Sequence, residues 1–405
     1  MTVLYMTQNG VTDHIGRSQV APYVLSLARQ GFRLHVLSAE KPGQDTLIDK
    51  YQQLFDDVGI LWTRVRYRNK PQLVGQAFTQ VAMRLAAHRI VRQEGIRLIH
   101  CRSFPPAVIG HGLKRALGVK YIFDFRDFYV DGGLENRRGL ARLAFRRLKR
   151  LEGPMIRDAD KVVCLTDRAR EVLSGWYLSD VHQPERRFRV IPCCADFTHF
   201  DAARLTAADL ARAREKAGLQ PGEFVLLYLG SLGPDYLLPQ MVALFRQVLT
   251  VQSRARFLFA SNNGKELVEA ECDAQGVARD AVRFLSADRE EIPALIALAD
   301  LSVVFIRAAR SKAGCSPAKL AELFACNVPV IANTGVGDLD NIISLQRNGS
   351  VIVHDFSEET LRAAVQQVIR FNETSTVSIR ENSREFALEE GVARYAAVYR
   401  ELLNE

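Results

Sequence analysis

Short apolar runs alternate with longer amphipathic segments along the first half of the chain. The runs have the length of buried strands, and the stretches between them are long enough for helices. Strands that are apolar on both faces are typical of parallel sheets covered by helices on both sides. The expected strands are residues 3–7, 33–38, 98–101, 121–125 and 161–165, and the expected helices are residues 19–29, 78–94 and 107–117.

The same pattern starts again after an irregular stretch that follows residues 188–192. Six further strands are expected at residues 224–230, 256–260, 282–285, 301–306, 328–332 and 350–353. Two such series predict an α/β protein made of two Rossmann-like, doubly wound domains that face a central cleft. We expect the N-terminal domain at residues 1–197 and the C-terminal domain at residues 198–382, with the last helix, about 383–405, packed back on the first domain.

Composition supports two ordinary globular cores. The chain has 405 residues, of which 48% are hydrophobic and 25% charged, and a chain of this length favours two domains. No run approaches the roughly 18–20 apolar residues that span a bilayer. The seven cysteines are scattered and form no CxxC pair, so they predict reduced thiols in a cytoplasmic protein and no metal site.

The net charge of +8 favours anionic partners, and much of it lies in two segments, residues 64–70 and residues 137–150, the latter from Arg137 to Arg150. At helical spacing this segment places leucines near one face and arginines around the rest. Two interpretations stay open: a solvated helix surface, or a basic amphipathic helix resting on anionic lipid at the inner face of the cell membrane. The basic stretches carry no nucleic-acid-binding motif, which argues against that partner.

Ligands of doubly wound folds bind beyond the carboxyl ends of the strands, so the residues after each strand are the candidates for function. After the first strand, glycines allow close approach of the backbone to a ligand. Arginines and an aspartate follow two later strands, and burying such charges is costly unless they pair with each other or with a ligand. Arg126 and Asp127 could form such an internal pair. The N-terminal candidates are Gly10, Asp13, His14, Arg17, Arg102, Arg126 and Asp127.

Residues 311–341 carry the strongest signal. A loop with Gly314 leads to Pro317, which suits the start of a helix, and Lys319 and Glu322 then lie three residues apart on one helical face. Amides at the helix start together with a lysine suit a diphosphate, and a carboxylate one turn later suits ribose hydroxyls. Upstream, residues 230–233 form a glycine loop after a strand, which is a plausible pyrophosphate platform.

Several segments together resemble the retaining GT-B glycosyltransferases numbered four in the usual family scheme. The resemblance spans essentially the whole chain and rests on TDHIGRSQVAPY, LIHCRS, YLGSLG and, above all, SPAKLAELFACNVPVIANTGVGD, which is similar to the family's EAxAxGxPVIA signature. It implies a nucleotide-diphosphate-sugar donor held by the C-terminal domain and a glycan, lipid-linked or small-molecule acceptor held by the N-terminal domain. It also implies transfer with retention of anomeric configuration, without metal or other cofactor.

Several positions depart from the family pattern, among them Arg102 in place of the second His of an HxH motif and Arg126 in place of the His of a His-Asp pair. Glu322 resembles the second Glu of the family's E-x7-E pair, which contacts ribose, but the first Glu falls at Gly314. Ser231 stands where the family has a phosphate-binding Arg, so Lys319, with Lys312 as a second candidate, is expected to supply the missing charge.

The resulting hypothesis is a glycosyltransferase of cell-surface polysaccharide or glycoconjugate synthesis. Lys319, Ser316 and Arg126 are the expected catalytic residues. The expected donor-binding residues are Gly230, Ser231, Gly233, Phe284, Gly314, Cys315, Ser316, Lys319, Leu320 and Glu322. The acceptor is expected at Gly10, Asp13, His14, Arg17, Arg102 and Asp127. The alternatives are a catalytically inactive GT-B subunit that binds nucleotide sugar or acts as a scaffold, and a nucleotide-sugar epimerase. The sequence leaves open the donor base, the sugar, the acceptor and the linkage.

Overall fold

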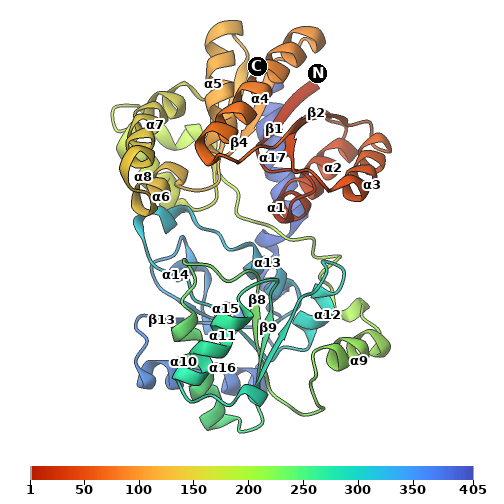
Figure 1. Cartoon of the computed structure of the whole chain (residues 1–405), viewed down its shortest axis with the longest axis vertical. Helices are drawn as coiled ribbons and strands as arrows, with labels where there is room; N and C mark the ends of the chain where they lie inside the picture. The colour runs from red at the N-terminus through yellow and green to blue at the C-terminus, as the bar shows by residue number, and fades with distance from the viewer. Residues whose placement is uncertain (1, 405) are drawn as a thin grey trace. The chain divides into compact units, whose positions relative to one another are not determined.

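The computed structural model describes residues 2–404, which form two compact units (Figure 1). Unit 1 contains Met1–Cys193, Arg310–Cys315 and Leu388–Glu405, and unit 2 contains Cys194–Ala309 and Ser316–Ala387. The predicted domains divide after residue 197, and they assign residues 310–315 to the C-terminal domain. The contacts of this short segment group it with unit 1 instead.

Unit 1 is built on one parallel sheet in the order β3-β2-β1-β4-β5-β6-β7. Strands β1, β4, β5 and β6 are buried along almost their whole length, which explains why their sequences lack a polar face. The strands are β1 Thr2–Thr7, β2 Arg33–Glu40, β3 Leu61–Arg66, β4 Leu98–Arg102, β5 Lys120–Phe125, β6 Lys161–Cys164 and β7 Phe188–Val190.

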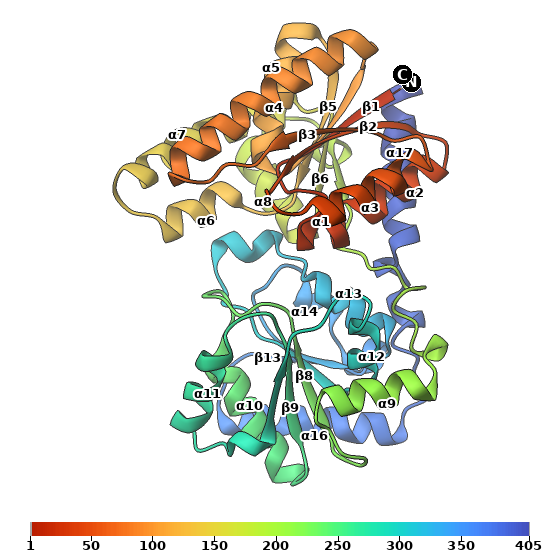
Figure 2. The ribbon, with the colours of Figure 1, turned by 45° about the vertical axis from the view of Figure 1, so that its right-hand side comes forward.

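Helices cover both faces of this sheet (Figure 2). Helices α4, α5, α7 and α8 bury residues in the hydrophobic core on one face, and α2 lies beside α17 on the other. The helices of unit 1 are α1 His14–Gln19, α2 Ala21–Arg29, α3 Asp45–Asp56, α4 Gln72–Glu94, α5 Phe104–Leu117, α6 Tyr129–Asn136, α7 Gly139–Asp158, α8 Asp167–Tyr177 and α17 Leu388–Asn404, with 3-10 turns η1 Pro184–Arg187 and η4 Arg310–Gly314.

Unit 2 repeats the architecture with a parallel sheet in the order β10-β9-β8-β11-β12-β13. One face packs against α10, α11 and α16 around a second hydrophobic core. The strands are β8 Val225–Leu229, β9 Arg256–Ala260, β10 Val282–Leu285, β11 Leu301–Val304, β12 Val330–Asn333 and β13 Val351–Val353. The helices are α9 Ala207–Lys216, α10 Leu238–Val251, α11 Lys265–Ala274, α12 Ile292–Ala297, α13 Ala318–Ala325, α14 Leu339–Ile342, α15 Leu345–Asn348 and α16 Glu358–Thr374, with 3-10 turns η2 Ala202–Arg204, η3 Arg279–Ala281 and η5 Glu381–Phe386.

These two sheets confirm the predicted pair of doubly wound Rossmann-like domains. The prediction missed both edge strands of unit 1, namely β3, whose residues are only partly buried, and the three-residue β7. It also began the last helix too early, because Glu381–Phe386 forms a separate 3-10 turn before α17. Helix α7 buries Phe145, Met155 and Ile156, whereas two of the leucines expected on one face, Leu140 and Leu143, are exposed. Within residues 2–404, no helix combines the length and the apolar character needed to cross a membrane.

Candidate functional site

The strand order of each unit places a switch point where the order of connections reverses. In unit 2 it lies between β8 and β11, and in unit 1 between β1 and β4. Loops that leave the carboxyl ends of such strands diverge and leave room for a ligand. The glycine loop Gly230–Gly233 follows β8 in unit 2, and the loop with Gly10 and Asp13 follows β1 in unit 1.

Lys319 in the first turn of α13 lies beside the glycine loop of unit 2. Its Nζ is 4.4 Å from the ring centroid of Tyr228 and 4.5 Å from that of Tyr236, so the ammonium is placed by two aromatic faces. A Cβ added at Gly230 would lie 3.3 Å from the same Nζ, and Gly230 has a φ of +111° that favours glycine. The structure therefore brings together the lysine and the loop that the sequence assigned to the same diphosphate.

The glycine loop is held by a residue that the sequence analysis missed. Asn263, after β9, accepts a hydrogen bond from the amide of Leu232 (3.0 Å) and donates one to its carbonyl oxygen (2.7 Å). The hydroxyl of Tyr228 donates to the carbonyl oxygen of Ser231 (2.9 Å). These contacts hold the backbone of the loop, and the only sequence signal for them was an Asn-Gly turn at the end of a strand.

Glu322 lies one turn after Lys319 on α13, and its side chain is 15% exposed. Burial raises the pKa of Glu322, while Arg289 and Lys319 oppose the shift. A guanidinium nitrogen of Arg289 lies 3.6 Å from a carboxylate oxygen of Glu322, and the guanidinium also lies over the ring of Phe200 at 5.5 Å. The carboxylate is therefore accompanied by a cation that the sequence analysis did not identify.

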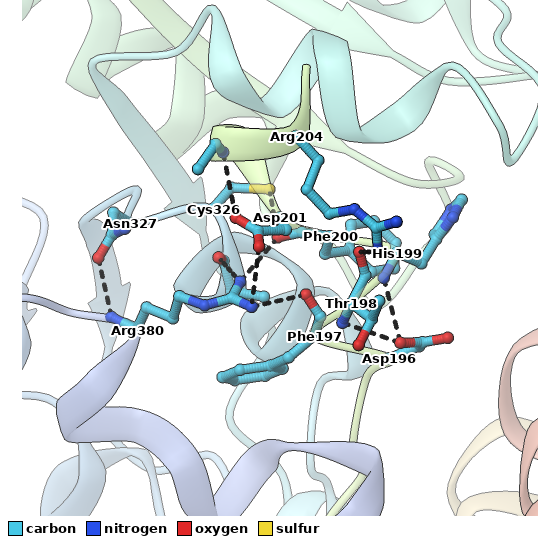
Figure 3. Close-up of polar contacts among 12 residues, drawn as sticks. Asp196, Phe197, Thr198, His199, Phe200, Asp201, Arg204, Cys326, Asn327 and Arg380 are labelled. Carbon is cyan, nitrogen blue, oxygen red and sulfur yellow. Dashed lines mark hydrogen bonds and ion pairs between the residues drawn. The ribbon is translucent and has the colours of Figure 1, made fainter.

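Arg380 fastens the segment Asp196–Asp201 to the end of α13 (Figure 3). Its guanidinium donates to the carbonyl oxygens of Phe200 (3.1 Å), Ala325 (2.6 Å) and Phe197 (2.8 Å), and it stacks on the ring of Phe197 at 5.1 Å. We call these contacts of Arg380 the Arg380 clamp. Because the ring of Phe200 lies beneath Arg289, which pairs with Glu322, the clamp fixes the surroundings of the Glu322 carboxylate. Nothing in the local sequence around residue 380 indicates this role, since its partners lie far away along the chain.

The other predicted donor residues have different surroundings. Ser316 is partly buried just before Pro317, and the side chain of Leu320 is buried at 2% exposure. Phe284 on β10 stacks on Phe259 of the core at 6.3 Å, which gives it a packing role.

Gly314 and Cys315 belong to the segment that groups with unit 1. A Cβ added at Gly314 would lie 3.2 Å from the ring of Phe128, so a side chain there would require the ring to shift by a few tenths of an ångström. The neighbouring Ala313 carbonyl oxygen accepts a hydrogen bond from the hydroxyl of Thr166 (2.7 Å). The missing carboxylate of the E-x7-E pattern thus coincides with a position that the ring of Phe128 closely approaches.

In unit 1, the loop after β1 is organised by Glu40 at the end of β2. The buried Glu40 carboxylate accepts hydrogen bonds from the amides of Val11 (2.7 Å) and Thr12 (3.3 Å) and from the Thr12 hydroxyl (2.7 Å). A Cβ added at Gly10 would lie 2.6 Å from this carboxylate, and one at Gly16 only 1.9 Å from the carbonyl oxygen of Gly10. The two glycines let the backbone of the loop approach Glu40 and pack closely against itself. The Glu40 carboxylate binds the amides of Val11 and Thr12, which the sequence interpretation had left available for an anionic ligand.

Four predicted acceptor residues lie together in and directly after this loop. Asp13 forms an ion pair with Lys41 (2.9 Å), and its other oxygen accepts a hydrogen bond from the amide of Gly10 (3.2 Å). Nη2 of Arg17 lies 3.1 Å from Nδ1 of His14 at the protein surface. The structure therefore gathers Gly10, Asp13, His14 and Arg17 at the carboxyl end of β1.

Arg126 belongs to a buried network in unit 1. Its guanidinium lies 3.6 Å from the carboxylate of Asp124 and donates to the hydroxyl of Tyr395 on α17 (3.2 Å). Nε2 of His100 lies 3.2 Å from Asp124, and Nδ1 lies 2.7 Å from the hydroxyl of Tyr399. Burial opposes ionisation of Asp124, but Arg126 and His100 outweigh it and lower its pKa, whereas burial lowers the pKa of His100.

These contacts give Arg126 a structural role, with Asp124 rather than the expected Asp127 as its ionic partner. Successive side chains of a strand alternate between its two faces, so Asp124 and Arg126 lie on the same face, whereas Asp127 points to the opposite one. Asp127 is exposed, and its assignment to the acceptor stays a prediction, as does the catalytic role of Arg126. Arg102 is buried at the end of β4, directly before Ser103, whose φ of +72° is unusual for a residue other than glycine.

Comparison with known proteins identifies both units. Residues 17–194 match the family model described as a glycosyl transferase 4-like domain, and residues 223–370 match the model of glycosyl transferases group 1. Alpha-monoglucosyldiacylglycerol synthase of Streptococcus pneumoniae is 25% identical over 283 residues, which cover 69% of this chain and 61% of that protein. The chain spans less than two thirds of the length of the curated relatives it matches, with shares of 61% and 46%.

Solved structures share the fold over nearly the full chain. A glycosyltransferase from Rickettsia africae has a TM-score of 0.71 at 16% identity and covers 99% of this chain and 98% of its own. The Anabaena protein HepE, solved in complex with UDP-glucose, has a TM-score of 0.68 at 14% identity and covers 99% of this chain and 100% of its own. At these identities the likeness establishes the two-domain fold.

Proposed function

This chain belongs to the GT-B glycosyltransferases that join a glycosyl transferase 4-like domain to a group 1 domain, and we propose that it is a retaining transferase. It moves a sugar from a nucleotide-diphosphate donor held by unit 2 to an acceptor held by unit 1. The relative from Streptococcus pneumoniae is named as the synthase of a glycolipid, and HepE was solved with UDP-glucose. Both names fit a nucleotide-sugar donor.

The observation that carries the proposal is the position of Lys319. Its ammonium lies between two tyrosine rings, beside the glycine loop at the switch point of unit 2. The amides of Gly230 and Leu232 donate to Ala260 and Asn263, so we assign the diphosphate to the other amides of the loop and to the ammonium. Ser316 lies three residues before the lysine. Glu322, one turn later, accepts hydrogen bonds from the ribose hydroxyls in this proposal. The remaining donor contacts are assigned to Gly230, Ser231 and Gly233.

In this proposal, Lys319 and the loop amides stabilise the leaving group. When the anomeric bond breaks, negative charge develops on the departing diphosphate, and a preorganised cation with backbone amides stabilises that charge. The acceptor hydroxyl attacks from the side of the leaving group, and the leaving phosphate takes its proton. Retention of configuration follows, and no protein base is required. Among the described residues no group of three metal-ligating side chains gathers, and independence from metal remains a prediction.

The acceptor is assigned to the residues gathered after β1 in unit 1, namely Gly10, Asp13, His14 and Arg17, with Arg102 and Asp127. A cytoplasmic site that contacts the inner face of the membrane through α7 fits a lipid-linked acceptor. Two exposed leucines of this helix, Leu140 and Leu143, lie among its arginines and support such a contact.

One observation favours a second candidate, a GT-B subunit that binds nucleotide sugar without transferring it. Position 314, where the first Glu of the E-x7-E pair falls, is a glycine closely approached by the ring of Phe128. The donor sugar would then lack that contact. Turnover distinguishes the two candidates, because the second predicts donor binding without transfer to any acceptor or to water.

The test replaces Lys319 by Ala and measures transfer or donor hydrolysis. Loss of one preorganised charge of this kind costs on the order of 10²- to 10³-fold in kcat. Lys265→Ala is the matched control, since Lys265 is an exposed lysine of the same unit and should leave turnover unchanged. Wild-type turnover of Lys319→Ala would refute the assignment.

The donor is identified by thermal shift against UDP-, GDP-, CMP- and dTDP-sugars. A ligand that binds only the folded state raises the melting temperature in proportion to the logarithm of its concentration over Kd. The cognate nucleotide should stabilise the wild-type protein and Lys265→Ala alike, and Lys319→Ala less. Failure of all four classes to stabilise the wild-type protein would count against both candidates.

A further inference from the structure

Helix α4 of unit 1 carries a stripe of exposed apolar side chains that the proposed function does not use. The apolar stripe consists of Val74, Phe78, Val81 and Leu85, which are 52%, 58%, 56% and 67% exposed. Their spacing of four, three and four residues places them on one face of the helix. The opposite face is buried in the core of unit 1 through residues such as Met83, so the helix has two apolar faces and only one is covered.

A basic hollow adjoins the N-terminal end of this helix. It has a volume of about 650 Å³, and its lining includes four cations and no carboxylate. Within the described part of the chain, no carboxylate pairs with Arg66, Arg68 or Lys70. The lining residues are Lys41, Pro42, Arg66, Tyr67, Arg68, Asn69 and Lys70.

The hollow and the apolar stripe form one continuous surface. The guanidinium of Arg68 lies over the ring of Phe78 at 6.0 Å. The hydroxyl of Thr79, on the next residue of α4, accepts a hydrogen bond from the amide of Arg68 (2.9 Å), which fixes the loop against the helix. On the same face as the stripe, toward the C-terminal end, follow the exposed Arg89 and Arg92. Cations therefore flank the apolar side chains at both ends.

We propose that this surface binds the anionic headgroups of a lipid bilayer. The basic hollow receives a phosphate-bearing headgroup, and the apolar stripe inserts among the neighbouring acyl chains. Exposed apolar side chains next to lysine and arginine are the chemistry by which helices bind at an anionic interface. A polyanion in water, such as nucleic acid, would leave the apolar stripe without a partner. A second copy of the chain would bring the same cations against each other.

The location of the hollow also relates it to the loop after β1. Lys41, which lines the hollow, forms the ion pair with Asp13 described above. A bilayer bound at this surface would therefore lie next to the residues assigned to the acceptor. The binding itself does not depend on the transfer reaction, so vesicle binding and turnover are measured separately.

The experiment is co-sedimentation of the full chain with vesicles of phosphatidylcholine, with and without phosphatidylglycerol. We expect binding only to the anionic vesicles, weakened by salt because the charges are screened. Each cation near an anionic surface contributes about fivefold, so the triple variant R66A/R68A/K70A should bind on the order of a hundredfold more weakly. Leu85→Gln should weaken binding by about tenfold, because it removes an inserted apolar side chain.

Matched variants separate this surface from a general effect of charge or hydrophobicity. The triple variant R212A/R246A/R254A removes the same charge from exposed positions of unit 2 and should leave binding within about twofold of the wild-type value. Leu267→Gln replaces a leucine that is 61% exposed in unit 2 and should have no effect. Circular dichroism during urea unfolding reports whether each variant is folded, and tryptophan fluorescence reports on unit 1 separately, because Trp62 and Trp176 both belong to it.

Several outcomes would overturn the proposal. Equal binding to neutral and anionic vesicles would exclude headgroup recognition, and undiminished binding of R66A/R68A/K70A would exclude the basic hollow. Displacement of bound protein by inorganic phosphate at constant ionic strength would identify a site for free anions. Loss of binding in Leu140→Gln but not in Leu85→Gln would assign the membrane contact to α7. Concentration-dependent dimers abolished by Leu85→Gln would assign the stripe to a second copy.

Discussion

Replacing Arg380 by Ala should loosen the segment Asp196–Asp201 and lower the stability of unit 2. The guanidinium donates to three carbonyl oxygens and is 19% exposed. A hydrogen bond to a charged group contributes about 1.5–3 kcal/mol, but the freed carbonyls can regain water at this partly open site. Three such bonds add up to about 4.5 kcal/mol at the lower bound, and we expect a smaller loss of about 3 kcal/mol because water replaces part of these bonds.

Hydrogen exchange of the amides of residues 196–204 is the assay that reports on the clamp directly. Tryptophan fluorescence does not serve, because both tryptophans, Trp62 and Trp176, belong to unit 1. Nucleotide affinity should fall as well. Arg380 holds the backbone of Phe200, whose ring lies beneath Arg289, and Arg289 in turn pairs with Glu322, the proposed ribose contact.

The control is Arg384→Ala in the same region of the chain. Arg384 is 67% exposed and pairs with Glu381 at the surface, where such a pair contributes under about 1 kcal/mol. Arg380→Lys should lie between the wild type and Arg380→Ala, because one ammonium cannot reach three separated carbonyl oxygens. If exchange rates and urea midpoints of Arg380→Ala matched those of Arg384→Ala, the clamp would not stabilise unit 2 and the reasoning would fail.

Two further predictions concern the donor carboxylate and the loop after β1. Burial raises the pKa of Glu322, so the carboxylate takes up a proton at a higher pH than an ordinary glutamate. Nucleotide affinity, measured by calorimetry, should therefore fall as the pH is lowered through that raised pKa, and an equally steep fall in Glu322→Gln would contradict the ribose assignment. Gly16→Ala places a Cβ 1.9 Å from a backbone oxygen and should destabilise unit 1 by about 3 kcal/mol, whereas Gly112→Ala, with no atom within 4 Å, should stabilise it by up to about 1 kcal/mol. Tryptophan fluorescence during urea unfolding reports both, and equal midpoints for the two variants would refute the steric argument.

The pattern of apolar runs was sufficient to predict both sheets, because strands buried on both faces have a distinctive composition. The edge strands β3 and β7 were not predicted, since the residues of β3 are only partly buried and β7 has only three residues. The joint position of Lys319 and Glu322 was also predictable, because residues three apart on a helix share a face whatever surrounds them.

Three residues of the candidate site were beyond this reasoning: Glu40, Arg289 and Arg380. Each acts on residues that are distant along the chain, such as the amide of Val11 for Glu40 and the carbonyl oxygen of Phe197 for Arg380. Periodicity and spacing describe neighbours within one element, whereas these contacts arise only when loops of different strands meet at one edge of a sheet.

The first helix turn after residue 316 shows the same division. The sequence by itself determined that a helix with a lysine and a glutamate on one face follows a glycine-containing loop. Only the tertiary structure decided that the lysine lies against the rings of Tyr228 and Tyr236, and that the ring of Phe128 closely approaches Gly314. A helical face is set by local geometry, but which groups stand opposite it depends on how separate segments of the chain pack.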